Sequence, residues 1–383
     1  MSKASFFKPR IRRLLKQILS LPTAPFHEKA VSDFVRRHLE LIGVMYRMDR
    51  YGNIVAHLKR GNTLPTPLAL VAHMDHPGFY VEDVEDTIPR KQMGWRANAR
   101  ARVRILGGVG KISKGQHICF FSTPRNGSGE IIRIAKRDSN GTPTHVDVRL
   151  RELLVPGAFG AWDVPAFRRR GKKIYARAID DVCGVAVMLE VLSRLQKIKS
   201  TNLNLYCCFT RAEEVGFVGA AALATQHLLP KSTKIISIEM SKELPGKAEQ
   251  GKGFVVRIGD RATIFEPTLI GFMIRLARNI QSRKPNFRFQ AAVLDGGACE
   301  ATLFNARRYK SAGVALPLRN YHNRTPSGGI GMEYVDERDL QSLIEFLIEL
   351  PKKMETWGEY EKRLRARLEK NFMDWRKRLL SSA

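Results

Sequence analysis

The sequence predicts an α/β fold in which a three-layer, mostly parallel sheet is flanked by helices and carries a small inserted β-barrel-like domain. Two observations predict this fold. Short apolar runs alternate with helical patterns along most of the chain, which is typical of parallel strands that are buried on both faces. Between about residues 77 and 170 long helical patterns are absent, and short β-like runs follow one another across turn signals such as NGSG and SNGT.

The first elements are helical. Apolar residues recur at helical spacing from Ile11 to Leu19, so we expect an amphipathic helix that packs on the main domain. This segment is also rich in arginine and free of acidic residues, as transit peptides are, but its periodicity favours the packed helix. A second helical pattern runs from about His27 to Leu41.

Five apolar runs predict the strands of the main sheet. They are PLALVA before His73, IYARAI before Asp180, LNLYCCFT before Glu213, KIISI before Glu239 and GVALPL before His322. Helical patterns separate several of these runs, namely DVCGVAVMLEVLSRLQKI, VGFVGAAALATQHLL and PTLIGFMIRLARNIQ. This alternation predicts strand–helix–strand units.

The remaining segments divide the chain into units. The runs ARVRILGG, HICFFS, GEIIRIAKR and THVDVRL predict the strands of the inserted domain. From Lys352 onward the sequence has a charged helical pattern with 10 Lys/Arg and 5 Asp/Glu. We therefore predict a main domain of residues 1–76 and 171–350, an inserted β domain of residues 77–170, and a basic helical extension of residues 351–383.

Composition narrows the class of protein. The 383 residues are 44% hydrophobic and 27% charged, which is ordinary for a globular protein and excludes a disordered or fibrous chain. No stretch approaches the roughly 20 apolar residues that span a bilayer, so we expect no membrane partner. The five cysteines contain no C-x-x-C pair and predict reduced, buried residues in a cytoplasmic protein.

The net charge of +28 bears on partners rather than on the fold. Basic residues are spread along the whole chain, as on a solvated surface. At low salt such a charge attracts polyanions non-specifically. Because no nucleic-acid-binding motif is present, specific recognition of DNA or RNA is not expected.

Metal-ligating residue types stand where the apolar runs stop. They are His73, Asp75, Asp180, Asp181, Glu213, Glu214, Glu239 and His322. In open α/β sheets the functional crevice lies beyond the carboxyl ends of the strands, so residues far apart in sequence can meet there. Imidazoles and carboxylates without thiolates suit zinc, cobalt or manganese in a hydrolytic site. Singly, each residue has an ordinary structural explanation, such as an acidic first helical turn for Glu213 and Glu214.

Five segments in order resemble the M42 family of di-zinc aminopeptidases, within the wider M20/M28/M42 group of metallopeptidases. They are HMDHPGF, AIDDVCGVAVMLEVL, TRAEEVGFVGA, SIEM and PLRNYHN. His73 and Asp180 stand 107 positions apart, whereas Glu239 and His322 stand 83 apart. A long first gap that is filled by the insertion is the M42 arrangement, since the M20 group places its lid after the third acidic ligand.

The resemblance implies a cofactor of two divalent metal ions, with zinc favoured and Co²⁺ or Mn²⁺ as alternatives. Asp180 resembles the carboxylate that bridges both ions. His73 and Glu239 would complete one site, and Glu214 and His322 would complete the other. These five residues are the predicted metal ligands.

The resemblance also implies roles for residues beside the ligands. Glu213 would be the general base, and Asp75 would orient the imidazole of His73. Asp181 matches the second residue of the family's Asp-Asp pair. The sequence departs from the family at Glu239, where Asp is usual, and at Asn323, where Ser is common. His76 is a further departure and is expected to line the pocket rather than to bind metal.

The resemblance implies a cytoplasmic, metal-dependent aminopeptidase that hydrolyses N-terminal peptide bonds through a metal-activated water. It also implies peptide substrates and a homo-oligomer, typically a dodecamer in this family, although a charge of +28 on each copy would oppose close assembly. Two alternatives remain open. One is a di-metal amidohydrolase or deacylase that acts on N-acylated compounds. The other is an inactive basic homologue that binds polyanions.

Overall fold

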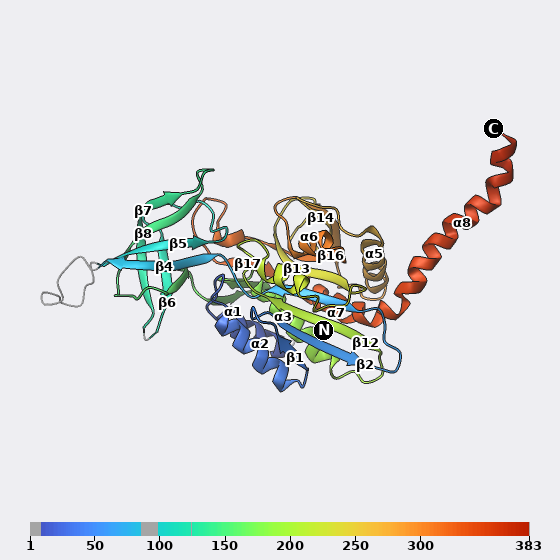
Figure 1. Cartoon of the computed structure of the whole chain (residues 1–383), viewed down its shortest axis with the longest axis horizontal. Helices are drawn as coiled ribbons and strands as arrows, with labels where there is room; N and C mark the ends of the chain where they lie inside the picture. The colour runs from blue at the N-terminus through green and yellow to red at the C-terminus, as the bar shows by residue number, and fades with distance from the viewer. Residues whose placement is uncertain (1–8, 86–98, 124, 383) are drawn as a thin grey trace, which may run out of the picture.

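Figure 1 shows the computed structural model, which describes residues 9–85, 99–123 and 125–382. A large α/β body lies at the centre. A β-barrel lies at one end of this body, and the long helix α8 (Trp357–Ser381) projects from the other end.

The body is built on an eight-stranded sheet. In spatial order its strands are β1 (Tyr46–Met48), β2 (Ile54–Arg60), β12 (Leu203–Thr210), β3 (Leu68–His73), β13 (Lys234–Lys242), β16 (Lys310–Leu318), β14 (Phe254–Asp260) and β15 (Phe289–Leu294). The four central strands, from β12 to β16, are parallel neighbours, whereas β2 and β14 pair antiparallel at their flanks. The carboxyl ends of the central strands therefore lie along one edge.

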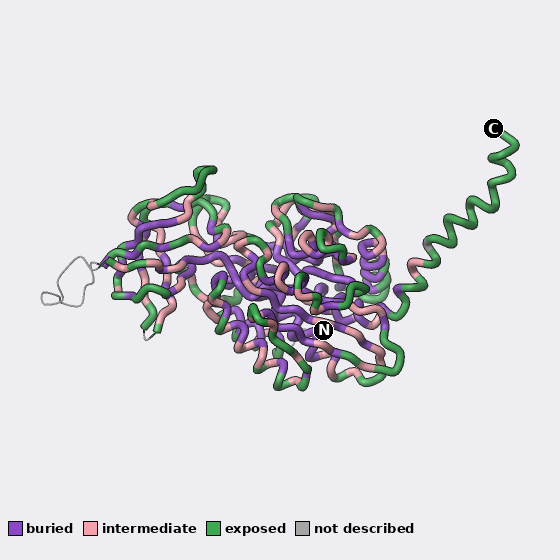
Figure 2. The backbone as a smooth tube through the Cα atoms, in the orientation of Figure 1, coloured by how far each residue is buried: buried purple, intermediate pink, exposed green. Residues whose placement is uncertain are grey.

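Helices cover both faces of the sheet. They are α1 (Pro9–Leu19), α2 (Lys29–Leu41), α3 (Val182–Leu195), α4 (Val218–Thr225), α5 (Pro267–Gln281), α6 (Glu300–Ala306) and α7 (Glu337–Lys353). Along β3, Leu68, Leu70 and Ala72 join the core with α1, α2, α3, α5 and α7, and Ala69 and Val71 join the core with α4. This period of two is that of a strand buried on both faces. Figure 2 shows the buried centre, and the predicted three-layer fold is confirmed.

The insertion forms a closed barrel with its own core, which includes Phe79, Phe120 and Trp162. Its strands are β4 (Gly78–Glu85), β5 (Arg100–Leu106), β6 (His117–Phe121), β7 (Gly127–Arg137), β8 (Pro143–Leu150) and β9 (Phe159–Trp162). Closure leaves no unpaired sheet edge. The predicted barrel-like insertion is confirmed, while the three unit boundaries stay a prediction.

Three predicted details differ in the structure. The run IYARAI gives β11 (Lys173–Ala176), which lies in a small sheet between β10 (Phe167–Arg170) and β17 (Glu333–Asp336) rather than in the main sheet. An apolar run predicts a strand but not its neighbours. The strand that was expected to stop at Glu239 continues to Lys242. The helix after Glu214 starts only at Val218, because Gly216 and Phe217 adopt positive φ.

The C-terminal tail is not one helix. The end of α7 is followed by the 3₁₀ turn η3 (Met354–Thr356), and only then does α8 begin. Within residues 9–85, 99–123 and 125–382, no helix has both the length and the apolar character that crossing a bilayer requires.

Asp336 joins the small sheet to α7 and makes a testable contribution to stability. Its carboxylate accepts hydrogen bonds from the backbone amide of Arg338 at 2.9 Å and from Lys173 Nζ at 3.0 Å. Burial alone would raise the pKa of Asp336. The hydrogen bonds from Arg338 and Lys173 outweigh this effect and lower the pKa from 3.8 to about 2. The stabilisation is therefore fully present above about pH 4 and is lost as the pH falls towards 2.

We expect the free energy of unfolding of Asp336→Asn to depend less on pH between 4 and 2 than that of the wild type. Urea unfolding at several pH values measures this difference. Asp163→Asn, at an exposed position, is the control. Equal pH slopes in Asp336→Asn and the wild type would show that these hydrogen bonds do not stabilise the fold.

Candidate metal centre

The carboxylate of Asp180 lies between two imidazoles. Its Oδ1 is 3.7 Å from Nε2 of His73, and its Oδ2 is 3.6 Å from Nε2 of His322. Asp180 is buried, and its Oδ1 has no hydrogen-bond partner among the described residues. The two oxygens of one carboxylate thus face two different histidines, which is the arrangement of a bridging ligand.

Three groups of donor atoms surround this carboxylate. They are His73–Asp180–Glu239, Asp180–Glu214–His322 and His73–Glu213–Glu214, and within each group the ligand atoms lie within 4.8 Å of one another. The structure therefore brings together all five predicted ligands and the predicted base. Mixed imidazole and carboxylate donors at such separations fit divalent metal ions.

Backbone carbonyls set the orientation of both imidazoles. Nδ1 of His73 lies 3.1 Å from the carbonyl oxygen of Asp75, and Nδ1 of His322 lies 2.6 Å from that of Gly108. A carbonyl only accepts, so each Nδ1 donates its hydrogen and Nε2 is the ring nitrogen that is left for a metal. Both Nε2 atoms face carboxylates, as metal ligation requires.

The cluster concentrates negative charge in a buried place. Burial is the largest cause that raises the pKa of Glu213 well above its usual range and the pKa of Glu214 and of Glu239 to about 7 each. Neighbouring carboxylates raise these values further. A nearby divalent cation favours the ionised forms, so the carboxylates and the ions would stabilise one another.

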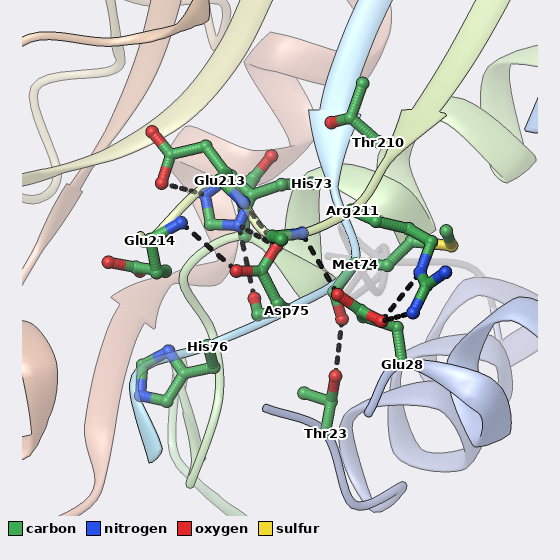
Figure 3. A network of polar contacts seen from close by, with 12 residues as sticks. Thr23, Glu28, His73, Met74, Asp75, His76, Thr210, Arg211, Glu213 and Glu214 are labelled. Atoms are coloured by element: carbon green, nitrogen blue, oxygen red, sulfur yellow. Dashed lines mark hydrogen bonds and ion pairs between the residues drawn. The ribbon is translucent and has the colours of Figure 1, made fainter. Parts of the chain in front are cut away.

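Figure 3 shows how Asp75 joins two loops. Its carboxylate accepts hydrogen bonds from the backbone amides of Glu213 at 3.0 Å and Glu214 at 3.1 Å. Oδ1 of Asp75, which accepts the amide of Glu213, also lies 3.6 Å from Nδ1 of His73. Asp75 therefore fixes the loop after β12 beside the end of β3, in addition to lying next to the imidazole that it was predicted to orient.

A second support holds the same loop. Ala212 adopts φ 51°, which is unfavourable for a residue other than glycine. The carboxylate of Glu28 accepts the backbone amide of Ala212 at 3.0 Å and pairs with Arg211 at 2.8 Å. Figure 3 shows this pair to the right of Asp75. The N-terminal segment thus stabilises the backbone conformation that presents Glu213 and Glu214.

Comparison with known proteins identifies the family. A family model described as M42 glutamyl aminopeptidase matches residues 147–345. The chain belongs to the M42 peptidase family. A putative aminopeptidase of Acetivibrio thermocellus is 22% identical over 355 residues, which cover 88% of this chain and 97% of that protein.

Solved structures show the same fold. A TET aminopeptidase from a marine-sediment thaumarchaeote has a TM-score of 0.75 at 20% identity and covers 92% of this chain and 100% of its own. An aminopeptidase from Desulfurococcus kamchatkensis has a TM-score of 0.73 at 22% identity, with coverages of 91% and 96%. The TET1 peptidase of Pyrococcus horikoshii has a TM-score of 0.70 at 22% identity, with coverages of 89% and 99%.

Two departures from the M42 pattern contact each other. His76 is buried, and its Nδ1 lies 2.6 Å from the carbonyl oxygen of Asp180 while its Nε2 lies 3.2 Å from Oδ1 of Asn323. Burial lowers the pKa of His76 to about 4, so the ring is neutral. It lies outside the three groups of donor atoms and supports the backbone of Asp180 instead.

Asp181 follows the candidate ligand Asp180 and directly precedes α3. Its Oδ1 accepts the backbone amide of Gly184 at 3.2 Å, and the Asp180–Asp181 peptide bond is cis. Its carboxylate therefore serves as the N-cap of a helix.

Sequence reasoning missed Glu333. This fully buried residue at the start of β17 accepts the backbone amides of Ile179 at 2.8 Å and Asp180 at 3.1 Å through Oε2, and of His322 at 2.8 Å through Oε1. It thus joins the segments that carry two of the predicted M42 ligands. A carboxylate that binds only backbone amides belongs to no ligand motif, so its role becomes visible only in the folded chain.

We expect Glu333→Ala to lower the free energy of unfolding by about 3 kcal/mol, because three backbone amides would lose their acceptor in a buried place. Urea unfolding with a chelator present measures this without a contribution from metal binding. Glu345→Ala is the control, since it removes a surface ion pair with Lys284 and one hydrogen bond from Gln341, and should cost less than about 1 kcal/mol. A loss in Glu333→Ala as small as in the control would contradict the structural role.

Proposed function

We propose that this M42 protein is a di-metal aminopeptidase that hydrolyses the N-terminal bond of peptides through a metal-activated water. The observation that carries the proposal is the position of the Asp180 carboxylate between His73 and His322. A carboxylate that has a different histidine beside each of its oxygens can bind two ions at once. A single ion would need only one of the groups of donor atoms.

The chain offers a complete set of donors. His73, Asp180 and Glu239 would hold one ion, and Asp180, Glu214 and His322 would hold the other. Zn²⁺ is the ion that we propose, with Co²⁺ and Mn²⁺ as alternatives that accept the same donors. When bound, the pair of ions would supply Lewis acidity to the scissile carbonyl and to water.

Glu213 is the proposed general base. Its carboxylate lies beside the cluster, with Oε2 3.8 Å from Nε2 of His73, and it remains slightly exposed, with a relative exposure of 8%. Its backbone amide is held by Asp75, so the side chain is positioned by the fold rather than by substrate. From this position Glu213 can take a proton from water and return it to the leaving amine.

A substrate panel tests the proposal. We expect the purified protein, loaded with Zn²⁺ or Co²⁺, to hydrolyse aminoacyl chromogenic substrates and short peptides with a free α-amine. The N-acetylated forms of the same compounds should not react. Faster hydrolysis of the N-acetylated forms would favour a deacylase. Absence of both metal and hydrolysis would reject the enzyme proposal.

We extend the proposal to a homo-oligomer in the cytoplasm. The TET1 peptidase of Pyrococcus horikoshii is described as assembling into a tetrahedron or a large octahedral shell, and this chain has its fold. Five free cysteines suit a reducing compartment. We expect light scattering to give a mass several times the 43.3 kDa of one chain. A mass near 43.3 kDa would contradict the assembly.

A further inference from the structure

In the described part of the chain, the hydrogen bonds, ion pairs and ring contacts between helix α8 and the body lie near the beginning of the helix. Trp357 is buried, its ring lies 5.4 Å from that of Phe272, and Glu361 pairs with Lys310 at 2.6 Å. From Lys362 to Ser381 every residue whose burial is described is exposed, and Figures 1 and 2 show the helix projecting away from the body. The exposed part, residues 362–381, has 20 residues and so is about 30 Å long.

Large apolar side chains form a stripe along this exposed part. Leu368, Phe372, Trp375 and Leu379 are 59%, 60%, 63% and 65% exposed. Their spacings of four, three and four residues place them on one face of the helix. Exposed large apolar residues are ordinary when they are scattered singly, but a continuous stripe marks an interaction surface.

Basic residues border the stripe on both sides. Residues 362–381 contain eight Lys/Arg and two Asp/Glu. At about 100° per residue, Arg365 and Arg376 follow one border, and Arg367 and Arg378 follow the other. All four are exposed, and none forms an ion pair with another residue in the described part of the chain.

The charges indicate what covers the stripe. A second copy of α8 packed on the stripe would bring arginine close to arginine, which disfavours self-association. Nucleic acid would satisfy the arginines through phosphates but would leave the leucines, Phe372 and Trp375 without apolar contact. An anionic lipid surface satisfies both groups, because apolar side chains enter the acyl boundary while arginines reach the headgroup phosphates.

We propose that residues 362–381 of α8 bind the surface of membranes that contain anionic lipids, with the apolar stripe facing the lipid. The expectation of no membrane partner rested on the lack of a spanning segment, and a helix that lies on the surface is a different case. This proposal does not depend on the peptidase activity.

Vesicle sedimentation with the full-length protein tests the proposal. At 0.15 M NaCl we expect binding to vesicles of phosphatidylglycerol and phosphatidylcholine, and much weaker binding to phosphatidylcholine alone. The double variant Phe372→Ser/Trp375→Ser keeps every charge and should bind the anionic vesicles about tenfold more weakly or worse. The matched control Leu41→Ser/Met45→Ser removes two apolar side chains that are 82% and 80% exposed elsewhere, and should bind like the wild type.

Fluorescence locates the contact. The emission of the wild type should shift to shorter wavelength on anionic vesicles, and this shift should be absent in Trp375→Phe, which should still bind. Equal vesicle binding by the wild type and Phe372→Ser/Trp375→Ser would overturn the proposal and assign binding to net charge alone. The proposal would also be overturned by a loss of self-association in that variant without any loss of lipid binding.

Discussion

Glu213→Gln is expected to lower kcat by about 10³-fold while the metal content of the protein stays unchanged. Glutamine has nearly the same shape as glutamate but cannot accept a proton from water. The five proposed ligands are left intact, and the backbone amide of residue 213 still reaches Asp75. Steady-state kinetics on an aminoacyl substrate, together with metal analysis of the same sample, measures both quantities.

Glu214→Gln is the informative comparison for this variant. The two residues are adjacent, but only Glu214 belongs to the group with Asp180 and His322. We expect Glu214→Gln to lose metal as well as activity, whereas Glu213→Gln loses activity alone. Full activity in Glu213→Gln would remove this residue from its proposed role, and loss of metal from it would make it a ligand.

Asp180→Asn is expected to weaken binding at both metal positions and to lower kcat/KM by about 10³-fold or more. Asp180 is shared by two of the groups of donor atoms, so one substitution changes both. Asparagine keeps the size of the side chain but removes the negative charge and offers only one oxygen. Titration of the metal-free protein with Zn²⁺ should show two equivalents for the wild type and fewer for the variant.

The comparison with Glu239→Gln separates a bridging role from an ordinary one. Glu239 occurs in only one of the three groups of donor atoms. Its substitution should therefore weaken the binding of one metal ion and leave the binding of the other unchanged. The thermal midpoint of the metal-loaded protein should fall further in Asp180→Asn than in Glu239→Gln, because bound metal stabilises the folded state by mass action. Two tightly bound equivalents in Asp180→Asn would contradict the bridging arrangement.

The sequence predicts much of this site because of where its residues stand relative to strands. His73 ends β3, and Glu213 and Glu214 follow β12 closely. Since β3 and β12 are parallel neighbours, the residues at their carboxyl ends meet. Asp180 reaches the same place by a different route, because it follows β11 of the small sheet and directly precedes Asp181, the N-cap of α3.

What the sequence did not predict depends on contacts between distant segments. Glu333 acts on Ile179, Asp180 and His322 only through backbone amides, and no local pattern marks such a residue. The contact between Nε2 of His76 and Oδ1 of Asn323 joins positions 247 residues apart. Periodicity likewise cannot show that the tail after α7 leaves the body, because a charged amphipathic pattern is the same whether or not a partner covers it.

The loop after β5 has a consequence for the whole chain. Gly108 lies in the inserted unit, yet its carbonyl holds the imidazole of His322 at 2.6 Å, and a Cβ at this position would lie 3.1 Å from Nδ1 of that ring. An engineered protein without the barrel would therefore lose the acceptor that aims one of the proposed zinc ligands. Grafting the hydrolytic residues onto a minimal α/β scaffold would require a replacement carbonyl at the same place, so the catalytic unit extends beyond the sheet that carries most of it.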